Sequence, residues 1–215
     1  MKFDIIDSSF DSNNGINGGV IYFGSNENEN AKHDLNFINT SFVKNKSKYF
    51  GGVIYSKYKY LYTLKATNVM FKNNYAGVAG GVFFFQNFQN NPIDDKKCFF
   101  VNNNAELHGS NYATHPSLIK LNDINKFHHD DLKSGSHFPM EFIITDSFNN
   151  IIKDYNKYYD IYIKISLRRV DHSIIYDDDA DNDDDDDRYN YILKGNICLY
   201  MNGKLINIIN DISLL

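Results

Sequence analysis

Short apolar runs recur along the first half of the chain, and turn-forming residues separate them. Each run follows a pair of glycines or the remnant of one. The four runs are Val20-Ile-Tyr-Phe, Val53-Ile-Tyr, Val82-Phe-Phe-Phe and Asn111-Tyr-Ala. Because the runs are short and rich in β-branched and aromatic residues, they predict β-strands and not helices.

A second signal precedes each run: a phenylalanine followed three residues later by an asparagine. The motif starts at Phe10, Phe42, Phe71 and Phe100, so successive copies are 32, 29 and 29 residues apart. Two separate signals that keep their spacing in four copies indicate a tandem structural repeat. The repeat residues are Phe10, Asn13, Gly18, Gly19, Phe42, Asn45, Gly51, Gly52, Phe71, Asn74, Gly80, Gly81, Phe100, Asn103 and Gly109.

A unit of this size, with two or three short strands, cannot bury its own apolar face. Stacking successive units buries a continuous core and places equivalent strands about 4.8 Å apart. Residues 1–115 are therefore predicted to form a short right-handed parallel β-helix. We expect the repeat phenylalanines to stack inside it, and the repeat asparagines to form a ladder of side-chain amides. The glycine pairs suit a bend with positive φ or a close approach of two backbones.

The Phe-x-x-Asn motif with Gly-Gly-Val-Ile resembles the polymorphic outer-membrane protein repeat of β-helical surface and adhesin proteins, which have a pectin-lyase-like fold. The resemblance covers about residues 3–115. The motif also looks like the β-helical ectodomains of some lower-eukaryote surface proteins, including ones fused to seven-helix receptors. These families imply a secreted or surface-displayed interaction scaffold. Gly109-Ser110 departs from the glycine pair, as a terminal, capping coil would.

The pattern changes in the second half. Residues 116–137 are polar and contain three of the seven histidines, so they are predicted to be a linker. Alternating apolar and polar residues then predict strands over 138–145 and 159–168. Asn202-Gly203, between two apolar runs, predicts a two-residue hairpin. Residues 138–215 are thus expected to form a small antiparallel β-sandwich, Ig-like and truncated at its end, which makes the whole chain all-β.

One turn adds to the expectation of a sandwich. The residues Asp146-Ser-Phe-Asn-Asn150 resemble turns of bacterial Ig-like and filamin-like modules. Asparagine and aspartate suit such turns because their side chains bond to nearby backbone groups.

Composition narrows the classes of partner. The net charge of −5 gives little electrostatic support for binding nucleic acid. The sequence has no apolar window long enough to span a membrane, and its start lacks the apolar core of a signal peptide. Because the first repeat is already under way at Phe3, we expect a fragment of a longer surface protein that reaches a membrane only through other parts. Cys98 and Cys198 fall in different predicted domains and are read as isolated thiols.

Enzymes of the parallel β-helix class use clustered aspartates on strand surfaces. Two columns of the repeat contain carboxylates. They are Asp7, Asn39, Asn68 and Lys97, and Asp4, Asn36, Lys65 and Asp94. Neither column places two carboxylates side by side, and Asp94-Asp95 is the nearest approach. We therefore predict no catalytic residues and no cofactor, and a polysaccharide lyase or hydrolase stays the alternative function.

Two acidic or histidine-rich segments have the residue types of metal sites. His128-His129-Asp130-Asp131, with His115 and His137 nearby, matches no zinc spacing and is read as a solvated loop. The run Asp177–Asp187 lacks the glycine and glutamate of a calcium loop, and it is read as a self-repelling loop between strands. No metal is predicted.

Aromatic residues are dense after the second repeat motif, at Tyr49, Phe50, Tyr55, Tyr58, Tyr60 and Tyr62. Exposed tyrosines along a parallel sheet suit contacts with sugar rings, but packing is the favoured reading of these positions. The expected function is a non-enzymatic, extracellular interaction module for adhesion or for recognition of a glycan or a surface protein. An ectodomain fragment of a seven-helix receptor is a further alternative.

Overall fold

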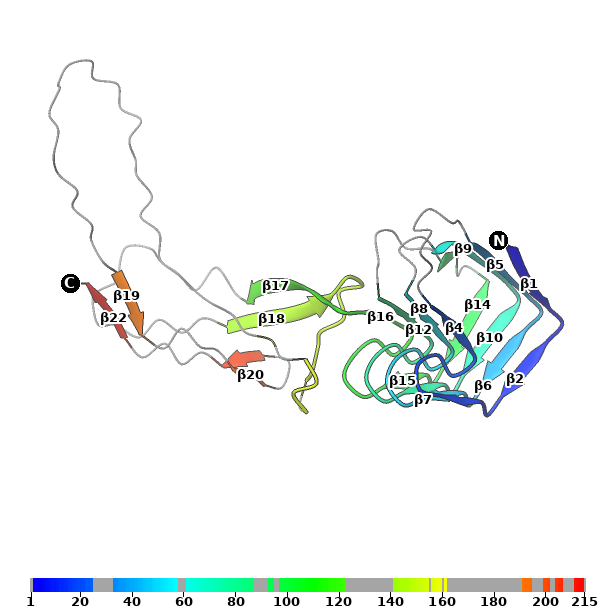
Figure 1. The fold of residues 1–215 in the computed structure, drawn as a ribbon, viewed down its shortest axis with the longest axis horizontal. Helices are drawn as coiled ribbons and strands as arrows, with labels where there is room; N and C mark the ends of the chain where they lie inside the picture. The colour runs from blue at the N-terminus through cyan, green and yellow to red at the C-terminus, as the bar shows by residue number, and fades with distance from the viewer. Residues whose placement is uncertain are drawn as a thin grey trace, which may run out of the picture.

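The computed structural model describes residues 2–24, 33–57, 61–86, 93–94, 97–122, 141–154, 156–159, 161, 191–194, 199–201, 204–206 and 211–214. All regular structure in these ranges is β-strand, which confirms the all-β class. Figure 1 shows a stack of parallel strands at the N-terminal end and smaller antiparallel pairs in the second half of the chain.

The first half is a parallel β-solenoid with four four-stranded sheets, each receiving one strand from every repeat. One sheet contains β1 (Lys2–Ile6), β5 (His33–Ile38), β9 (Leu61–Thr67) and β13 (Ile93–Asp94). The next contains β2 (Ser9–Asp11), β6 (Ser41–Val43), β10 (Val69–Lys72) and β14 (Cys98–Val101). The third contains β3 (Asn14–Gly15), β7 (Lys46–Ser47), β11 (Tyr75–Ala76) and β15 (Asn104–Ala105). The fourth contains β4 (Ile21–Phe23), β8 (Ile54–Ser56), β12 (Phe83–Phe85) and β16 (Tyr112–Thr114).

We number the coils in chain order, from coil 1 (β1 to β4) to coil 4 (β13 to β16). Equivalent residues lie beside one another in register: Phe10 pairs with Phe42, Phe42 with Phe71, and Phe71 with Phe100. Their rings stack in the interior with centroid separations of 5.0, 5.1 and 5.1 Å. This register confirms the parallel β-helix predicted from the repeat.

The repeat asparagines form a continuous ladder beside the phenylalanine stack. From Asn13 to Asn45, Asn74 and Asn103, the backbone N–H and side-chain amide of each residue donate to Oδ1 of the next, at 2.9–3.0 Å. The later three amides also donate to the phenylalanine carbonyl of the preceding coil. Because Asn45 and Asn74 are buried, a slipped register would leave these groups unpaired at a large cost.

The glycine pairs meet two different requirements. The first glycine of each pair has positive φ, between 66° and 72° at Gly18, Gly51, Gly80 and Gly109. The second lies against the next coil, so that a Cβ on Gly52 would be 2.1 Å from the carbonyl oxygen of Gly81. Coil 4 has no further coil beyond it, which explains why serine replaces the second glycine there.

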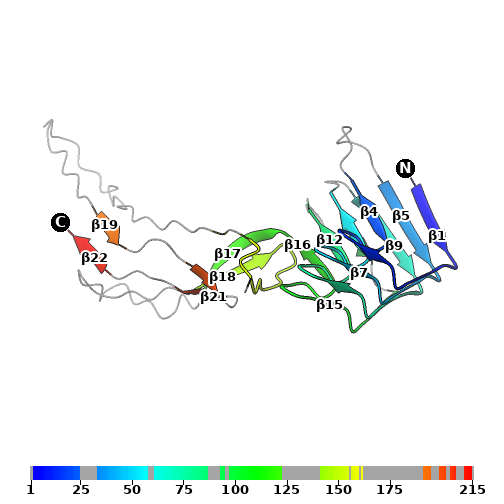
Figure 2. The same ribbon diagram turned by 60° about the horizontal axis from the view of Figure 1, so that its bottom comes forward.

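The chain continues into an antiparallel pair where a linker was expected. β17 (Pro116–Asn122) pairs with β18 (Glu141–Asp146), so the first seven residues of the predicted linker form a strand. The short apolar run in β17 is stabilised by its partner strand, which lies too far along the chain for a local pattern to reveal. Two views place β17 and β18 at the β16 end of the stack, opposite the N-terminus (Figures 1 and 2).

The remaining described strands form two more antiparallel pairs. β19 (Tyr191–Lys194) pairs with β22 (Asp211–Leu214), and β20 (Leu199–Met201) pairs with β21 (Lys204–Ile206). The second pair confirms the predicted hairpin. The structure shows separate two-stranded sheets in this half and no Ig-like sandwich among its described residues. Most of the predicted strand over 159–168 lies outside the described residues.

The residues after β18 cover the exposed end of coil 4. We call residues 146–154 and 156–159 the end cap. Lys153 donates its backbone N–H to the carbonyl of Leu107 at 3.3 Å, and the Asn150 side chain donates to the carbonyl of Tyr112 at 2.8 Å. Phe148 stacks on the Tyr112 ring at 5.6 Å. The end cap thus supplies contacts that a fifth coil would otherwise make.

Candidate functional site

A column of aromatic rings runs along the outer side of β4, β8 and β12. Tyr22, Tyr55 and Phe84 are in register, and their rings stack with centroid separations of 5.3 and 5.7 Å. Strand residues alternate in direction, so the neighbours Ile54 and Phe83 point into the core while this column points outward. The strand register therefore fixes the spacing of the rings.

The end cap adds further rings to this column. Tyr158 lies edge-on to Phe50 at 5.6 Å and contacts Tyr49 at 6.2 Å, while Phe50 packs on Phe84 at 4.3 Å. Tyr158 is 43% exposed and Tyr22 is 51% exposed, which leaves two ring faces open above a buried base. We define the aromatic patch as Tyr22, Tyr49, Phe50, Tyr55, Phe84 and Tyr158.

Polar groups border the aromatic patch. The Tyr55 hydroxyl donates to Oε1 of Gln86 at 2.9 Å, and Nζ of Lys48 lies 4.9 Å from the Tyr49 ring centroid. Burial raises the pKa of Tyr55, and its neighbours Tyr22 and Tyr158 add to the increase. Burial also raises the pKa of Tyr158. The Tyr158 hydroxyl consequently stays protonated at neutral pH and can donate a hydrogen bond to a bound molecule, whereas the single hydroxyl proton of Tyr55 is already donated to Gln86.

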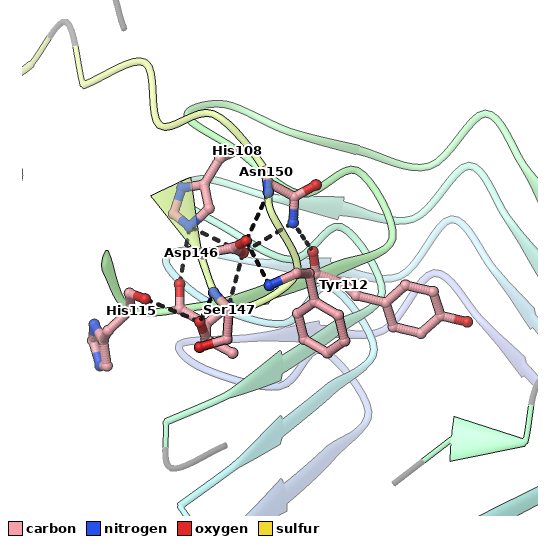
Figure 3. A network of polar contacts seen from close by, with 8 residues as sticks. His108, Tyr112, His115, Asp146, Ser147 and Asn150 are labelled. Carbon is pink, nitrogen blue, oxygen red and sulfur yellow. Dashed lines mark hydrogen bonds and ion pairs between the residues drawn. The ribbon is translucent and has the colours of Figure 1, made fainter. Parts of the chain in front are cut away.

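A second cluster, shown in Figure 3, joins coil 4 to the end cap. Its centre is the carboxylate of Asp146, which is fully buried. Oδ1 accepts from the backbone N–H groups of Phe148 and Asn150 at 2.9 and 2.8 Å. Oδ2 accepts from the Thr114 backbone at 3.1 Å and from the Asn150 side chain at 2.9 Å. Four hydrogen bonds compensate the cost of burying this charge.

His108 lies beside this carboxylate. Its Nε2 is 3.0 Å from the carbonyl oxygen of Thr114 and 3.8 Å from Oδ2 of Asp146. Since a carbonyl only accepts, Nε2 carries the proton and Nδ1 is left without a hydrogen-bond partner among the described residues. Burial lowers the pKa of His108, although the Thr114 carbonyl and the charges of Asp146 and Asp154 act in the opposite direction. The neutral imidazole therefore prevails despite the nearby carboxylate.

The geometry of this second cluster suits structural support. The side chains of His108 and Asp146 are both 0% exposed, so a substrate cannot contact them in this conformation. Asp154 likewise uses its carboxylate internally, accepting from the backbone N–H groups of Tyr158 and Tyr159 at 2.7 and 2.6 Å. Both aspartates thus set the path of the end cap, and Asp154 positions Tyr158 against the aromatic patch.

The carboxylate columns of the repeat are stacked as predicted. The Asn36 amide donates to Asp4 at 2.6 Å, and the Asn39 amide donates to Asp7 at 3.0 Å. Asp94 pairs in register with Lys65, and Asp95 lies outside the described residues. Asp4 and Asp7 thus each have an asparagine amide as their neighbour in the column.

The segments weighed as metal sites fall largely outside the described residues. These segments are residues 128–131, His137 and residues 177–187. His115 is described, and its ring packs edge-on against Phe50 and Phe84 at 5.7 and 5.1 Å. In the ranges that the structure describes, no group of three His, Cys, Asp or Glu side chains is placed to hold a metal ion.

The two exposed rings of the aromatic patch were not singled out from the sequence. The sequence instead drew attention to six aromatic residues after the second repeat motif. Of these, Phe50 and Tyr55 are buried by packing, whereas Tyr58 and Tyr60 lie outside the described residues. The repeat alignment contains a signal for Tyr22, because it occupies the same position of its run as Tyr55. Nothing local marks Tyr158, which reaches the patch through the fold of the end cap.

Comparisons with protein-family models, with curated proteins and with solved structures find no match. Within the part of the chain that the structure describes, no helix is long and apolar enough to cross a bilayer.

Proposed function

We propose that the chain is a non-enzymatic interaction module, secreted or displayed at a cell surface, and that it recognises glycans through the aromatic patch. The observation that carries this proposal is the pair of exposed rings, Tyr22 and Tyr158, on a buried aromatic base. Rigid tyrosines present apolar faces to sugar C–H groups and hydroxyls to sugar oxygens, with little loss of side-chain entropy on binding. The adjacent Gln86 amide adds a hydrogen-bonding group.

The wider architecture belongs to the same proposal. The Phe-x-x-Asn and glycine repeat supports kinship with polymorphic outer-membrane protein repeats and with the pectin-lyase-like fold. Right-handed winding agrees with the general handedness of parallel strand crossovers. We also infer that residues 138–215 form the antiparallel sandwich expected from their alternating pattern.

The test measures binding of soluble plant and microbial polysaccharides to the full chain by calorimetry. A few stacking contacts give a weak Kd, roughly 1 μM to 1 mM. Tyr22→Ala and Tyr158→Ala are each expected to weaken binding about fivefold, because removal of one stacked ring costs about 1 kcal/mol. Tyr75→Ala, on β11 in another sheet, is the matched control and should bind like the unaltered chain. Equal affinities for all four proteins would refute the aromatic patch as the glycan site.

The same mixtures separate binding from catalysis. A binding module releases no new reducing ends and no unsaturated products from pectin, xylan or other polysaccharides. Turnover that disappears in Asp94→Asn or Asp95→Asn would replace this proposal with the enzyme alternative.

A further inference from the structure

The outer part of the end cap covers two histidines. We call residues 153–154 and 156–159 the outer cap. Its Tyr159 ring lies 5.9 Å from the His108 ring and 6.1 Å from the His115 ring, measured between centroids. The His115 ring also packs edge-on against two phenylalanines at the base of the aromatic patch. The outer cap, the two histidines and the aromatic patch therefore share one packed interface, part of which Figure 3 shows.

Few bonds attach the outer cap to coil 4. Among the described residues there are two hydrogen bonds: the Lys153 backbone N–H donates to the Leu107 carbonyl at 3.3 Å, and the Asn156 amide donates to Glu106 at 3.4 Å. Both are long for hydrogen bonds of these types. The rest of the end cap is bonded to coil 4 at 2.8–3.1 Å. The outer cap is thus the part of the end cap that opens at the lowest cost.

Two buried polar groups at this interface have no hydrogen-bond partner among the described residues. They are Nδ1 of His108 and the hydroxyl of Tyr159. An unpaired buried polar group raises the free energy of the closed state. Water that reaches these groups when the outer cap opens would recover part of that cost.

Several titratable groups face His108. Asp146 comes from the end of β18, Asp154 and Tyr159 come from the outer cap, and His115 follows β16. Burial lowers the pKa of His108, although a backbone carbonyl and the two carboxylates act in the opposite direction. Burial also lowers the pKa of His115, and the neighbouring His108 adds to the decrease. Burial raises the pKa of Tyr159, so its hydroxyl is uncharged at neutral pH. On opening, both imidazoles return to the usual pKa of about 6.5, so the open form binds more protons and gains population as the pH falls.

We propose that the outer cap opens at mildly acidic pH, when both histidines take up protons, and that it withdraws Tyr158 from the aromatic patch. Asp154 accepts from the backbone N–H groups of Tyr158 and Tyr159, so the Tyr158 ring moves with the outer cap. Between about pH 7.5 and about pH 5.5, the ratio of open to closed forms rises by up to about tenfold for each histidine. The loss of glycan binding that results rests on the proposed function, whereas the opening itself does not.

Hydrogen exchange of the full chain, followed by NMR at about pH 7.5 and about pH 5.5, measures the opening directly. The rates are corrected for the intrinsic effect of pH on amide exchange. The backbone N–H groups of Tyr158 and Tyr159 should exchange up to about 100-fold faster at the lower pH, since two histidines contribute. The N–H of Asn74 in the ladder should stay much more protected at both pH values, because the opening is local.

Histidine variants identify the groups that cause the response. His115→Phe keeps a ring against the aromatic patch and should remove up to about tenfold of the acid effect. His108→Asn should likewise remove up to about tenfold, and the double variant should exchange at the same corrected rate at both pH values. His33→Asn, on β5, is the matched control and should respond to acid like the unaltered chain. Equal corrected rates at both pH values in the unaltered chain, or an acid response that persists in the double variant, would overturn the proposal.

Calorimetry with the polysaccharides at the same two pH values tests the consequence for binding. Affinity should fall on acidification in the unaltered chain and in His33→Asn, but not in the double variant. Full affinity at the lower pH, in a chain whose outer cap exchanges rapidly there, would overturn the link between the opening and the aromatic patch. Absence of binding at both pH values would refute the proposed function, and the exchange rates would still decide whether the outer cap opens.

Discussion

At the scale of single residues, the asparagine ladder fixes the register of the solenoid. The amides of Asn45 and Asn74 are each bonded to the coil before and to the coil after, so one side chain connects three layers. A hydrophobic residue of similar size would fill the space but could not replace these bonds. The ladder therefore specifies one alignment of coils among those that apolar packing alone would allow.

Replacement of Asn74 by leucine tests this role. The backbone N–H and amide of Asn45 would lose their acceptor. Oδ1 of Asn103 would lose its side-chain donor and keep only the backbone N–H of residue 74. We expect a loss of about 1–3 kcal/mol in the free energy of unfolding, the usual cost of unpaired buried polar groups. Chemical denaturation provides the measurement. Asn104→Leu, at an exposed position of β15, should change stability by less than about 0.5 kcal/mol.

His108 makes stability dependent on pH. Its pKa is lowered in the folded protein, so the unfolded chain binds more protons as the pH falls below the unfolded value of about 6.5. Stability is therefore complete above that pH and decreases below it, by about 1.4 kcal/mol for each pKa unit of difference. Burial lowers the pKa of His115 as well, which adds in the same direction.

Denaturation at about pH 7.5 and about pH 5.5 measures the effect. His108→Asn should be less stable at the higher pH but lose less on acidification than the unaltered chain. An unchanged pH dependence in His108→Asn would mean that other groups cause it.

At the scale of elements, the bend at each glycine pair, which we call the glycine corner, shows why two adjacent glycines recur in the repeat. Positive φ explains only the first, whereas contact between coils explains the second. Gly19, Gly52 and Gly81 each lie against a carbonyl oxygen of the following coil, at 2.1–2.2 Å from an added Cβ. A side chain at the second glycine would therefore collide with the backbone of the following coil.

Gly52→Ala is expected to force neighbouring coils apart. Its Cβ would meet backbone oxygens of Gly81 and Tyr75 at 2.1 and 2.8 Å, and backbone atoms cannot rotate away as side-chain ends can. Thermal or chemical unfolding should reveal a loss of at least about 1–3 kcal/mol, typical of overpacked sites. Ser110→Ala, at the equivalent position of coil 4, should be nearly neutral, and a comparable loss there would contradict the role of contact between coils.

The repeat made the columns of the solenoid predictable because, in a parallel stack, equivalent sequence positions become neighbours. That is why the phenylalanine stack, the asparagine ladder and the two columns that contain carboxylates could all be anticipated. The end cap could not, because Asp146, Phe148 and Asn150 meet coil 4 through contacts with no sequence period. The outward position of Tyr55 was also hidden, since its strand is apolar on both faces and shows no alternation.

At the scale of the whole molecule, the first and last coils of the solenoid have different surroundings. Among the described residues, the strands of coil 1 pair with coil 2, whereas coil 4 is covered by the end cap. The end cap therefore gives the coil 4 end of the stack a structure of its own. The aromatic patch depends on both parts, because Tyr22 belongs to coil 1 and Tyr158 to the end cap.

The inner repeats share a 29-residue spacing and stack in register, which bears on how such a chain can change its length. A coil begins and ends at the same place in the cross-section, so a gene duplication that copies one whole 29-residue unit needs no new connection. Each extra unit would lengthen the stack by about 4.8 Å and leave both ends chemically as they are. Partial duplications would instead misplace an asparagine or a glycine in every later layer. The ladder and the glycine corner together permit growth only in whole repeats.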